Sequence, residues 1–171
     1  MPQKVYNNVV GLRVIDNGRV AEDVTSVTLP TIKHPTTSIN AAGMAMAVEM
    51  PDTTRLDSAE IKVAHNNGVN CRYFINPGKH VIEVRTVRQK YNVVKGEIEY
   101  EPVKYRVTGV HVETEKGSIE MGNPYGSTEK FSVLRYEEEI DKQVITIADA
   151  MAGVIRFNGK DYTSVIENML K

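Results

Sequence analysis

Two strands joined by a short turn constrain the fold most, because they are too long to lie straight within a domain of this size. Residues 81–91 and 97–114 alternate apolar and polar side chains, and Val94-Lys95-Gly96 supplies the turn between them. At about 3.3 Å per residue the second strand would span roughly 55–60 Å. A domain of 171 residues has a diameter of only about 40 Å. The hairpin must bend, at Pro102 or Gly109, or project as an arm.

An arm formed by residues 80–114 leaves strand edges open to water, which invites pairing with another chain. Its side chains carry alternating charges. One interpretation is a solvated hairpin whose charges prevent aggregation. The other is an oligomerisation arm whose charges set the register between identical subunits. In that case the candidate interface residues are Arg85, Arg88, Glu97, Glu99, Glu101, Lys104 and Arg106.

The first sixty residues favour strands and irregular loops. The apolar run Val9–Ile15 ends at the turn sequence Asp16-Asn17-Gly18, and the β-branched run 24–29 ends before Pro30. Together they predict an N-terminal hairpin. Residues 31–58 contain scattered Pro, Gly, Ser and Thr, which predict a long loop with one short strand at 46–50.

A change of alternation beside Gly109 predicts a β-bulge. Val103, Tyr105 and Val107 carry the apolar face before the glycine, whereas Val110 and Val112 carry it afterwards. A bulge inserts one residue and shifts the faces of a strand in this way. Upstream, residues 59–65 alternate like a half-buried strand, and a short helix is possible over residues 69–75.

The last forty residues predict strands, tight turns and one helix. Phe131–Tyr136 favours a strand, and turns are expected at 140–143 and at Asn158-Gly159. Asp161 is a good N-cap for a helix over residues 161–170. Its apolar stripe is expected to cover an open end of the sheet, and consists of Tyr162, Val165, Ile166, Met169 and Leu170. We therefore predict one mainly β (α+β) domain over residues 1–171, an antiparallel β-barrel or sandwich.

Composition and charge exclude several classes of protein. The net charge of −1, from 21 basic and 22 acidic residues, argues against a dedicated nucleic-acid binder. The single Cys71 rules out an intramolecular disulfide framework. Since no apolar run approaches the length of about 20 residues that spans a bilayer, we expect no membrane anchor. The first residues do not resemble a signal peptide, so we expect synthesis in the cytoplasm.

Motifs for catalysis, cofactors or metals are not apparent. The 4 histidines lie far apart in sequence, without metal-ligand spacing, and are expected to be ordinary polar or surface side chains. The acidic run Glu137–Glu139 is best interpreted as a solvated strand end. We therefore predict no catalytic, cofactor-binding or metal-binding residues. An enzyme of unrecognised type would require perturbed carboxylates in a deep pocket, near Glu137 and Asp141.

Short sequence features in a fixed order resemble the major tail tube proteins of contractile-tailed phages and R-type bacteriocins. They are Val27-Thr28-Leu29-Pro30, Ala42-Gly43-Met44-Ala45, the stretch Phe131–Asp141, and the stretch from Val144–Asp149 through Gly159-Lys160-Asp161. The resemblance runs from Val5 to Leu170 and is strongest after Ser127. One departure is Lys142, where the family usually has glycine after the Asp.

The resemblance implies a structural role in a particle and no enzymatic activity. It implies hexameric rings that stack into a tube inside a contractile sheath, with the sheath, baseplate and tail terminator proteins as partners. DNA would pass through the lumen without specific binding, and the near-neutral charge is consistent with such a conduit. The protein would reside in a virion tail or bacteriocin particle. The alternative is a monomeric β-sandwich binding module of a tail or cell-surface assembly.

Overall fold

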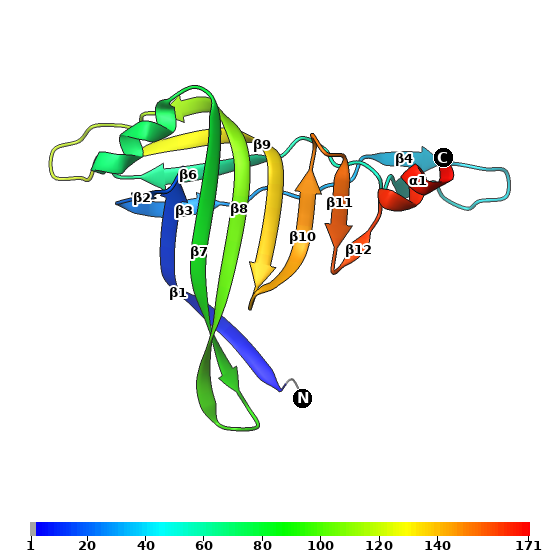
Figure 1. Cartoon of the computed structure of the whole chain (residues 1–171), viewed down its shortest axis with the longest axis horizontal. Coiled ribbons are helices and arrows are strands. Elements are labelled where there is room, and N and C mark those ends of the chain that lie inside the picture. Colours follow the sequence, from blue (N-terminus) through cyan, green and yellow to red (C-terminus); the bar gives the residue numbers. More distant parts are fainter. Residues whose placement is uncertain (1–2) are drawn as a thin grey trace.

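The computed structural model describes residues 3–171, and within this range strands dominate, which confirms the predicted mainly β class (Figure 1). In the same range no helix has the length and apolar character needed to cross a bilayer. The elements are β1 (Lys4–Asp16), β2 (Arg19–Ala21), β3 (Val24–Thr28), β4 (Thr36–Ile39), β5 (Val48–Pro51), β6 (Glu60–His65), the 3-10 helix η1 (Val69–Ile75), β7 (Lys79–Asn92), β8 (Glu97–Glu115), β9 (Ser127–Ile140), β10 (Gln143–Asp149), β11 (Val154–Phe157), β12 (Lys160–Asp161) and α1 (Ser164–Met169).

One antiparallel sheet forms the body, in the order β12-β11-β10-β9-β8-β7-β1-β2. On the side away from β8, strand β9 has two successive partners. Residues 127–132 pair with β6, and residues 135–140 pair with β10. Strand β6 in turn pairs with β3. The sheet therefore curls from β2 round to β3, strands that are consecutive in the chain (Figure 1). Within residues 3–171 these two strands do not pair, so the curl is not a closed barrel.

The hydrophobic core lies inside this curl. Helix η1, the green helix in Figure 1, covers one end of it and inserts Phe74, whose ring lies 5.8 Å from that of Phe131 on β9. Burial of each large apolar side chain contributes about 1.5–3 kcal/mol. The helix predicted over residues 69–75 is thus present in its 3-10 form. The core consists of Val14, Ala21, Ile61, Val63, Cys71, Phe74, Ile82, Val84, Val107, Phe131 and Tyr136.

The β7–β8 hairpin projects from the body, as Figure 1 shows below the sheet. Its register is continuous from Lys79 opposite Val110 to Asn92 opposite Glu97. Strand β9 accompanies β8 only as far as the pair Val103 and Ile140. On the other side β1 follows β7 to its end, where Lys4 lies opposite Asn92. We call residues 4–9, 86–92 and 97–102, with the turn 93–96, the outer arm.

One prediction for the N-terminal third is wrong and another is incomplete. Strand β1 pairs with β2 after the Asp16-Asn17-Gly18 turn, whereas β3 pairs with β6 and forms no hairpin with β1. The short strand predicted at 46–50 is present as β5, but within the predicted loop 31–58 it pairs with a second strand, β4, to form a separate hairpin. Strand β4 was not predicted because its four residues are all exposed and carry no apolar alternation.

The irregularity beside Gly109 lies on the neighbouring strand. Thr108 pairs with Arg135 and Gly109 with Val133, so the extra residue is Leu134 on β9. The faces of β8 do not change at Gly109, since Val112 is 56% exposed while His111 points inward. A bulge on β8 itself comes at Val112, between the pairs of His111 with Phe131 and Glu113 with Lys130. The predicted change of apolar face is therefore wrong. Glycine is needed because a Cβ at position 109 would lie 2.7 Å from the Ser132 carbonyl oxygen.

The C-terminal helix is shorter than predicted and its apolar stripe is not covered. Asp161 Oδ1 accepts hydrogen bonds from the Thr163 and Ser164 amides, both at 2.9 Å. Met169 and Leu170 are 80% and 82% exposed, and α1 has no buried residue. The expectation that this stripe covers an open end of the sheet is wrong, because its side chains stay exposed to solvent, and η1, at the other end of the molecule, covers the core (Figure 1).

The β9–β10 turn offers a test of backbone strain. Asp141 and Lys142 have φ angles of 48° and 66°, the left-handed region that favours glycine. Lys142→Gly removes a strain of about 1–2 kcal/mol but adds unfolded-state entropy worth about 0.4–1 kcal/mol. We expect the free energy of unfolding, measured by urea denaturation, to rise by about 0.5–1 kcal/mol. Lys160→Gly, on β12 at a position without positive φ, should not stabilise. A less stable Lys142→Gly protein would contradict the prediction.

Candidate functional site

The outer arm has one charged face and one apolar face. Residues directly opposite each other share a face, so Arg88 lies beside Glu101 and Lys90 beside Glu99. Both basic residues have the same parity along β7 as the core residue Ile82. The charged face is therefore the continuation of the inner side of the sheet. The other face carries more apolar side chains and continues the outer side.

The charged side chains on this face of the arm form ion pairs and hydrogen bonds with one another. Arg88 Nη2 lies 2.5 Å from Glu101 Oε2, and Lys90 Nζ lies 3.4 Å from Glu101 Oε1. Asn92 Nδ2 donates to Glu99 Oε1 at 2.8 Å, and Lys4 Nζ lies 3.4 Å from Glu99 Oε2. Burial raises the pKa of Glu101, but hydrogen bonds from Arg88 and Lys90 outweigh it and leave that pKa below its usual value. These charges hold the strands of the arm together.

The residues predicted to form a subunit interface divide into two groups. Arg88, Glu99 and Glu101 belong to the inner network just described. Arg85 and Arg106 both contact Glu83 on the outer side of the sheet, the second at 3.5 Å. Lys104 lies opposite Arg85 on one side and Glu139 on the other, and Glu97 lies opposite Asn92 at the tip. Their role between subunits stays a prediction.

Sequence reasoning missed the apolar face of the arm. Ile98 and Tyr100 are 56% and 62% exposed, and the other members of this face are also open to solvent. Exposed apolar side chains gathered in one place are typical of interaction surfaces. The alternation of side chains along each strand could have revealed this face, since residues that alternate with buried ones lie on the outward face. We call this surface the arm patch, and it consists of Val5, Val87, Tyr91, Ile98 and Tyr100.

A free strand edge lies next to the arm patch. Along this edge of β8, the last hydrogen bond to the β9–β10 turn is donated by the Asp141 amide to the Pro102 carbonyl oxygen at 3.0 Å. Beyond it, residues 97–101 of β8 have no strand on their outer side within the described part of the chain. An open edge beside an apolar surface favours pairing with another chain.

A second cluster of polar side chains, centred on Glu129, is buried in the core. His111 Nε2 lies 2.8 Å from Glu129 Oε2, and His65 Nε2 lies 3.6 Å from Oε1. Burial raises the pKa of Glu129, but contacts from His65, Thr114 and His111 outweigh it and lower that pKa to about 2. The expectation that the histidines are ordinary polar or surface residues is wrong for His65, His80 and His111, which lie at the core. Among residues 3–171 no group of side chains is arranged to hold a metal ion.

Glu129 makes the fold sensitive to acid. Its pKa falls from 4.5 to about 2 on folding, so the ionised carboxylate stabilises the folded state above pH 4.5. This contribution, about 3 kcal/mol, is lost as the pH falls from 4.5 towards 2. Urea denaturation at pH 3 and pH 6 should show this loss, and Glu129→Gln should reduce it. An unchanged pH dependence in Glu129→Gln would contradict this role.

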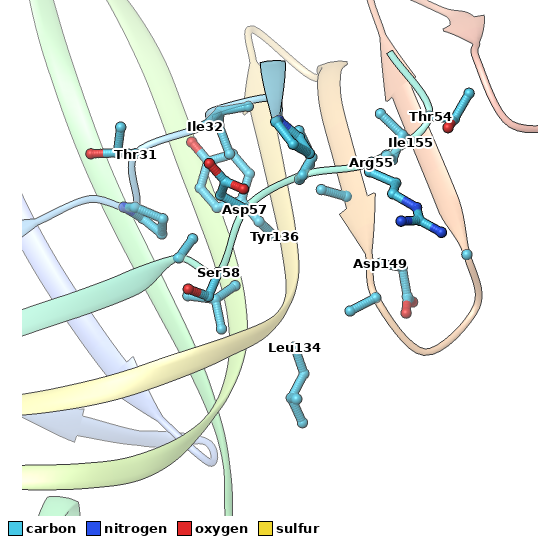
Figure 2. Close-up of a pocket in the computed structure, with 18 residues that line it drawn as sticks. Thr31, Ile32, Thr54, Arg55, Asp57, Ser58, Leu134, Tyr136, Asp149 and Ile155 are labelled. Carbon is cyan, nitrogen blue, oxygen red and sulfur yellow. The ribbon is translucent and has the colours of Figure 1, made fainter. Parts of the chain in front are cut away.

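A cavity of about 470 Å³ on the body does not support the enzyme alternative. It lies between the segments 30–35 and 54–59 and strands β9 to β11, and Figure 2 shows Ile32 close to the Tyr136 ring. Neither Glu137 nor Asp141 lines it. Asp149 does, but amides of Ala152 and Met151 and the Arg135 guanidinium hold its pKa below the usual value. Asp149 is therefore not an acid poised to donate a proton.

A family model described as phage tail tube protein FII matches residues 8–170. A solved chain from a PVC extracellular contractile injection system, titled sheath/tube terminator in extended state, is 13% identical with a TM-score of 0.55, covering 78% of this chain and 96% of that one. A chain from the PVC sheath–tube complex in extended state is 12% identical with a TM-score of 0.51, covering 75% and 87%. The search of curated proteins finds no match.

These two likenesses show a shared fold, and the family match spans nearly the whole sequence. An arm that projects with an apolar outer surface is consistent with a protein that assembles. The chain therefore belongs to the phage tail tube protein FII family, whose members are structural proteins of the tail tube.

Proposed function

We propose that copies of this tail tube protein form hexameric rings, and that the rings stack into a hollow tube inside a contractile sheath. The observation that carries the proposal is the outer arm, which exposes the arm patch and an open β8 edge on a projection from the body. A solvated arm would be expected to place its charges outward, whereas here the ion pairs face inward. Contact with a second copy would remove both the apolar surface and the open edge from water.

Ring closure requires different surfaces of each copy to meet head to tail. The body supplies two such surfaces, because the main sheet ends at β12 on one side and at β2 on the other. The apolar stripe of α1 lies beside the β12 end and is exposed in the single chain (Figure 1). We assign lateral contacts in the ring to these ends and axial contacts between rings to the outer arm.

The partners follow from this role. The two similar structures come from a sheath–tube complex and a sheath/tube terminator. By analogy, the tube would contact a sheath protein along its length, a terminator at its end and a baseplate below. A weakly acidic lumen would let DNA or ions pass without being held, because strong phosphate contacts produce tight binding. The protein would act as a structural part of a virion tail or bacteriocin particle, without enzymatic activity.

Electron microscopy of the purified protein tests the proposal. We expect rings or tubes, with a central hole, over a range of salt and protein concentrations. Monomers without rings or tubes under any salt condition would contradict it. The alternative of a monomeric binding module predicts instead a monomer whose elution in size-exclusion chromatography does not change with concentration. The projecting arm and its apolar surface favour assembly over that alternative.

A further inference from the structure

Helix η1 closes one end of the core and is held there by a histidine. Phe74 and Cys71 of η1 are 0% and 1% exposed. The helix ends at Asn76, its C-cap residue, and the Asn76 carbonyl oxygen lies 2.8 Å from His80 Nε2. This contact joins the end of the helix to the start of β7.

Both ring nitrogens of His80 face oxygen acceptors. Nε2 faces the Asn76 carbonyl, and Nδ1 lies 3.0 Å from each carboxylate oxygen of Asp16. A neutral imidazole carries a single N–H and so can donate to only one of these two partners. To satisfy both contacts, the Asp16–His80 pair must hold one proton more than an ionised carboxylate and a neutral imidazole. The extra proton resides on the ring or on the carboxyl group.

The surroundings favour retention of this proton. The pair is buried, and burial raises the pKa of Asp16, although hydrogen bonding and charge from His80, and the charge of Arg19 on β2, act against the increase. Phe131 on β9 covers one side of the His80 ring at 5.1 Å, with His111 and Glu129 beyond it. Arg19, Tyr73 of η1 and Lys79 line a cavity of about 270 Å³ that also reaches Asp16 and His80. Water can exchange the proton through this cavity.

We propose that the proton held between Asp16 and His80 latches η1 over the core, and that its removal at raised pH releases the helix end and exposes Cys71. After the proton leaves, two lone pairs face each other at one of the two His80 contacts. Asp16 is fixed by β-pairing to Ile82 and Arg19. Asn76 precedes Pro77-Gly78, and Gly78 has a φ of 117°, so the segment after the helix is the part that can rearrange.

The direction with pH follows from the carboxyl group. A group whose pKa is raised on folding stabilises the folded state at low pH, and this contribution is lost as the pH rises through the folded value. The latch is therefore closed at low pH and opens as the pH rises. The inference concerns a single chain and does not rest on the proposed ring or tube.

Cys71 reports the opening without any added probe site. It is the single cysteine, its Sγ donates to the Glu22 carbonyl at 2.8 Å, and burial raises its pKa to about 11. The purified full chain is labelled with a thiol reagent from pH 6 to pH 9.5. Each rate is divided by the rate of the urea-unfolded chain at the same pH, which cancels the ordinary ionisation of the thiol. We expect the ratio to rise by about tenfold, the effect of losing one net hydrogen bond.

The variant Asp16→Asn distinguishes the release of η1 from a general loss of stability at high pH. Its amide can donate to Nδ1, and the neutral His80 can then donate from Nε2 to Asn76, so no extra proton is needed. The ratio should stay low and flat with pH. Asp57→Asn, at an exposed pair with Lys33, should keep the wild-type rise. A flat ratio in the wild type, or an unchanged rise in Asp16→Asn, would overturn the proposal.

Nitrogen NMR of the His80 ring gives an independent measurement that needs no variant. The proposal predicts that at pH 6 both ring nitrogens are hydrogen-bonded through protons, with Nδ1 protonated or sharing a proton with Asp16, and that this signal changes over the same pH range as the Cys71 ratio. A ring at pH 6 whose Nδ1 neither carries a proton nor accepts a hydrogen bond from a protonated Asp16 would also overturn it.

Discussion

Truncation of Phe131 to alanine should lower the free energy of unfolding by about 3–5 kcal/mol. The side chain is 0% exposed and lies at the centre of the core. Its ring meets those of Phe74, His80 and His111 at 5.8, 5.1 and 5.5 Å. Its removal would leave a cavity that the strands cannot fill, because β9 is held by β6 and β8 on both sides. Urea denaturation measures the change.

An exposed aromatic residue provides the matched control for Phe131. Tyr125→Ala, in the loop before β9, should change stability by no more than about 0.5 kcal/mol, because its ring is exposed. Phe131→Leu should fall between the two, since it keeps most of the buried volume. A loss below about 1.5 kcal/mol in Phe131→Ala would show that the core rearranges around the gap, contrary to the close packing inferred here.

Local sequence patterns were sufficient for the strands and turns of the second half of the chain. The strands at 81–91 and 97–114 follow from alternation, and the structure extends them only slightly, to Lys79–Asn92 and Glu97–Glu115. The Asn158-Gly159 turn also follows from its residues, which adopt φ angles of 49° and 79°. Such features depend on neighbours in sequence, and for this reason they can be predicted without tertiary structure.

Pairing between distant strands could not be predicted in the same way. Strand β3 could have joined β1 across a short turn, but it pairs with β6 because its partly buried Val24 and Val27 thereby pack on the core. The α1 stripe shows the same limit, since periodicity identifies an apolar face and does not identify what covers it. At Gly109 the irregularity lies on β9, a strand absent from the local pattern of β8.

In the candidate site, the alternation of residues along the strands indicates which side chains share a face, whereas composition alone does not. The charges of the arm are its most conspicuous feature in sequence, yet Lys90 and Glu101 are only 9% and 7% exposed. When side chains of different character alternate along a strand, the sequence alone does not show which of the two faces is buried. A residue known to lie in the core is needed to identify the inner face. Ile82 provides that reference on β7, and it leaves Tyr91 and its apolar neighbours on the outside.

Lysine placed in the arm patch should prevent tube assembly and leave the single chain folded. Ile98 and Tyr100 are solvent-exposed in the chain, so Ile98→Lys and Tyr100→Lys should change its stability by less than about 1 kcal/mol. In the tube, each would bury an unpaired charge in place of an apolar contact. We expect the protein concentration needed for assembly to rise at least about a hundredfold, which corresponds to about 2.7 kcal/mol. Sedimentation and electron microscopy measure it.

The matched control tests the charge-based interface directly. Glu97→Gln combined with Lys104→Gln removes two predicted interface charges that lie outside the Arg88–Glu101 and Lys90–Glu101 ion pairs of the inner network. If the arm patch drives stacking, this double variant assembles nearly as the wild type does, with a weaker dependence on salt. If it fails to assemble while Ile98→Lys still forms tubes, the charges set the register and the arm patch does not. The two variants thus distinguish an apolar contact between rings from an electrostatic one, because opposite outcomes are expected for each.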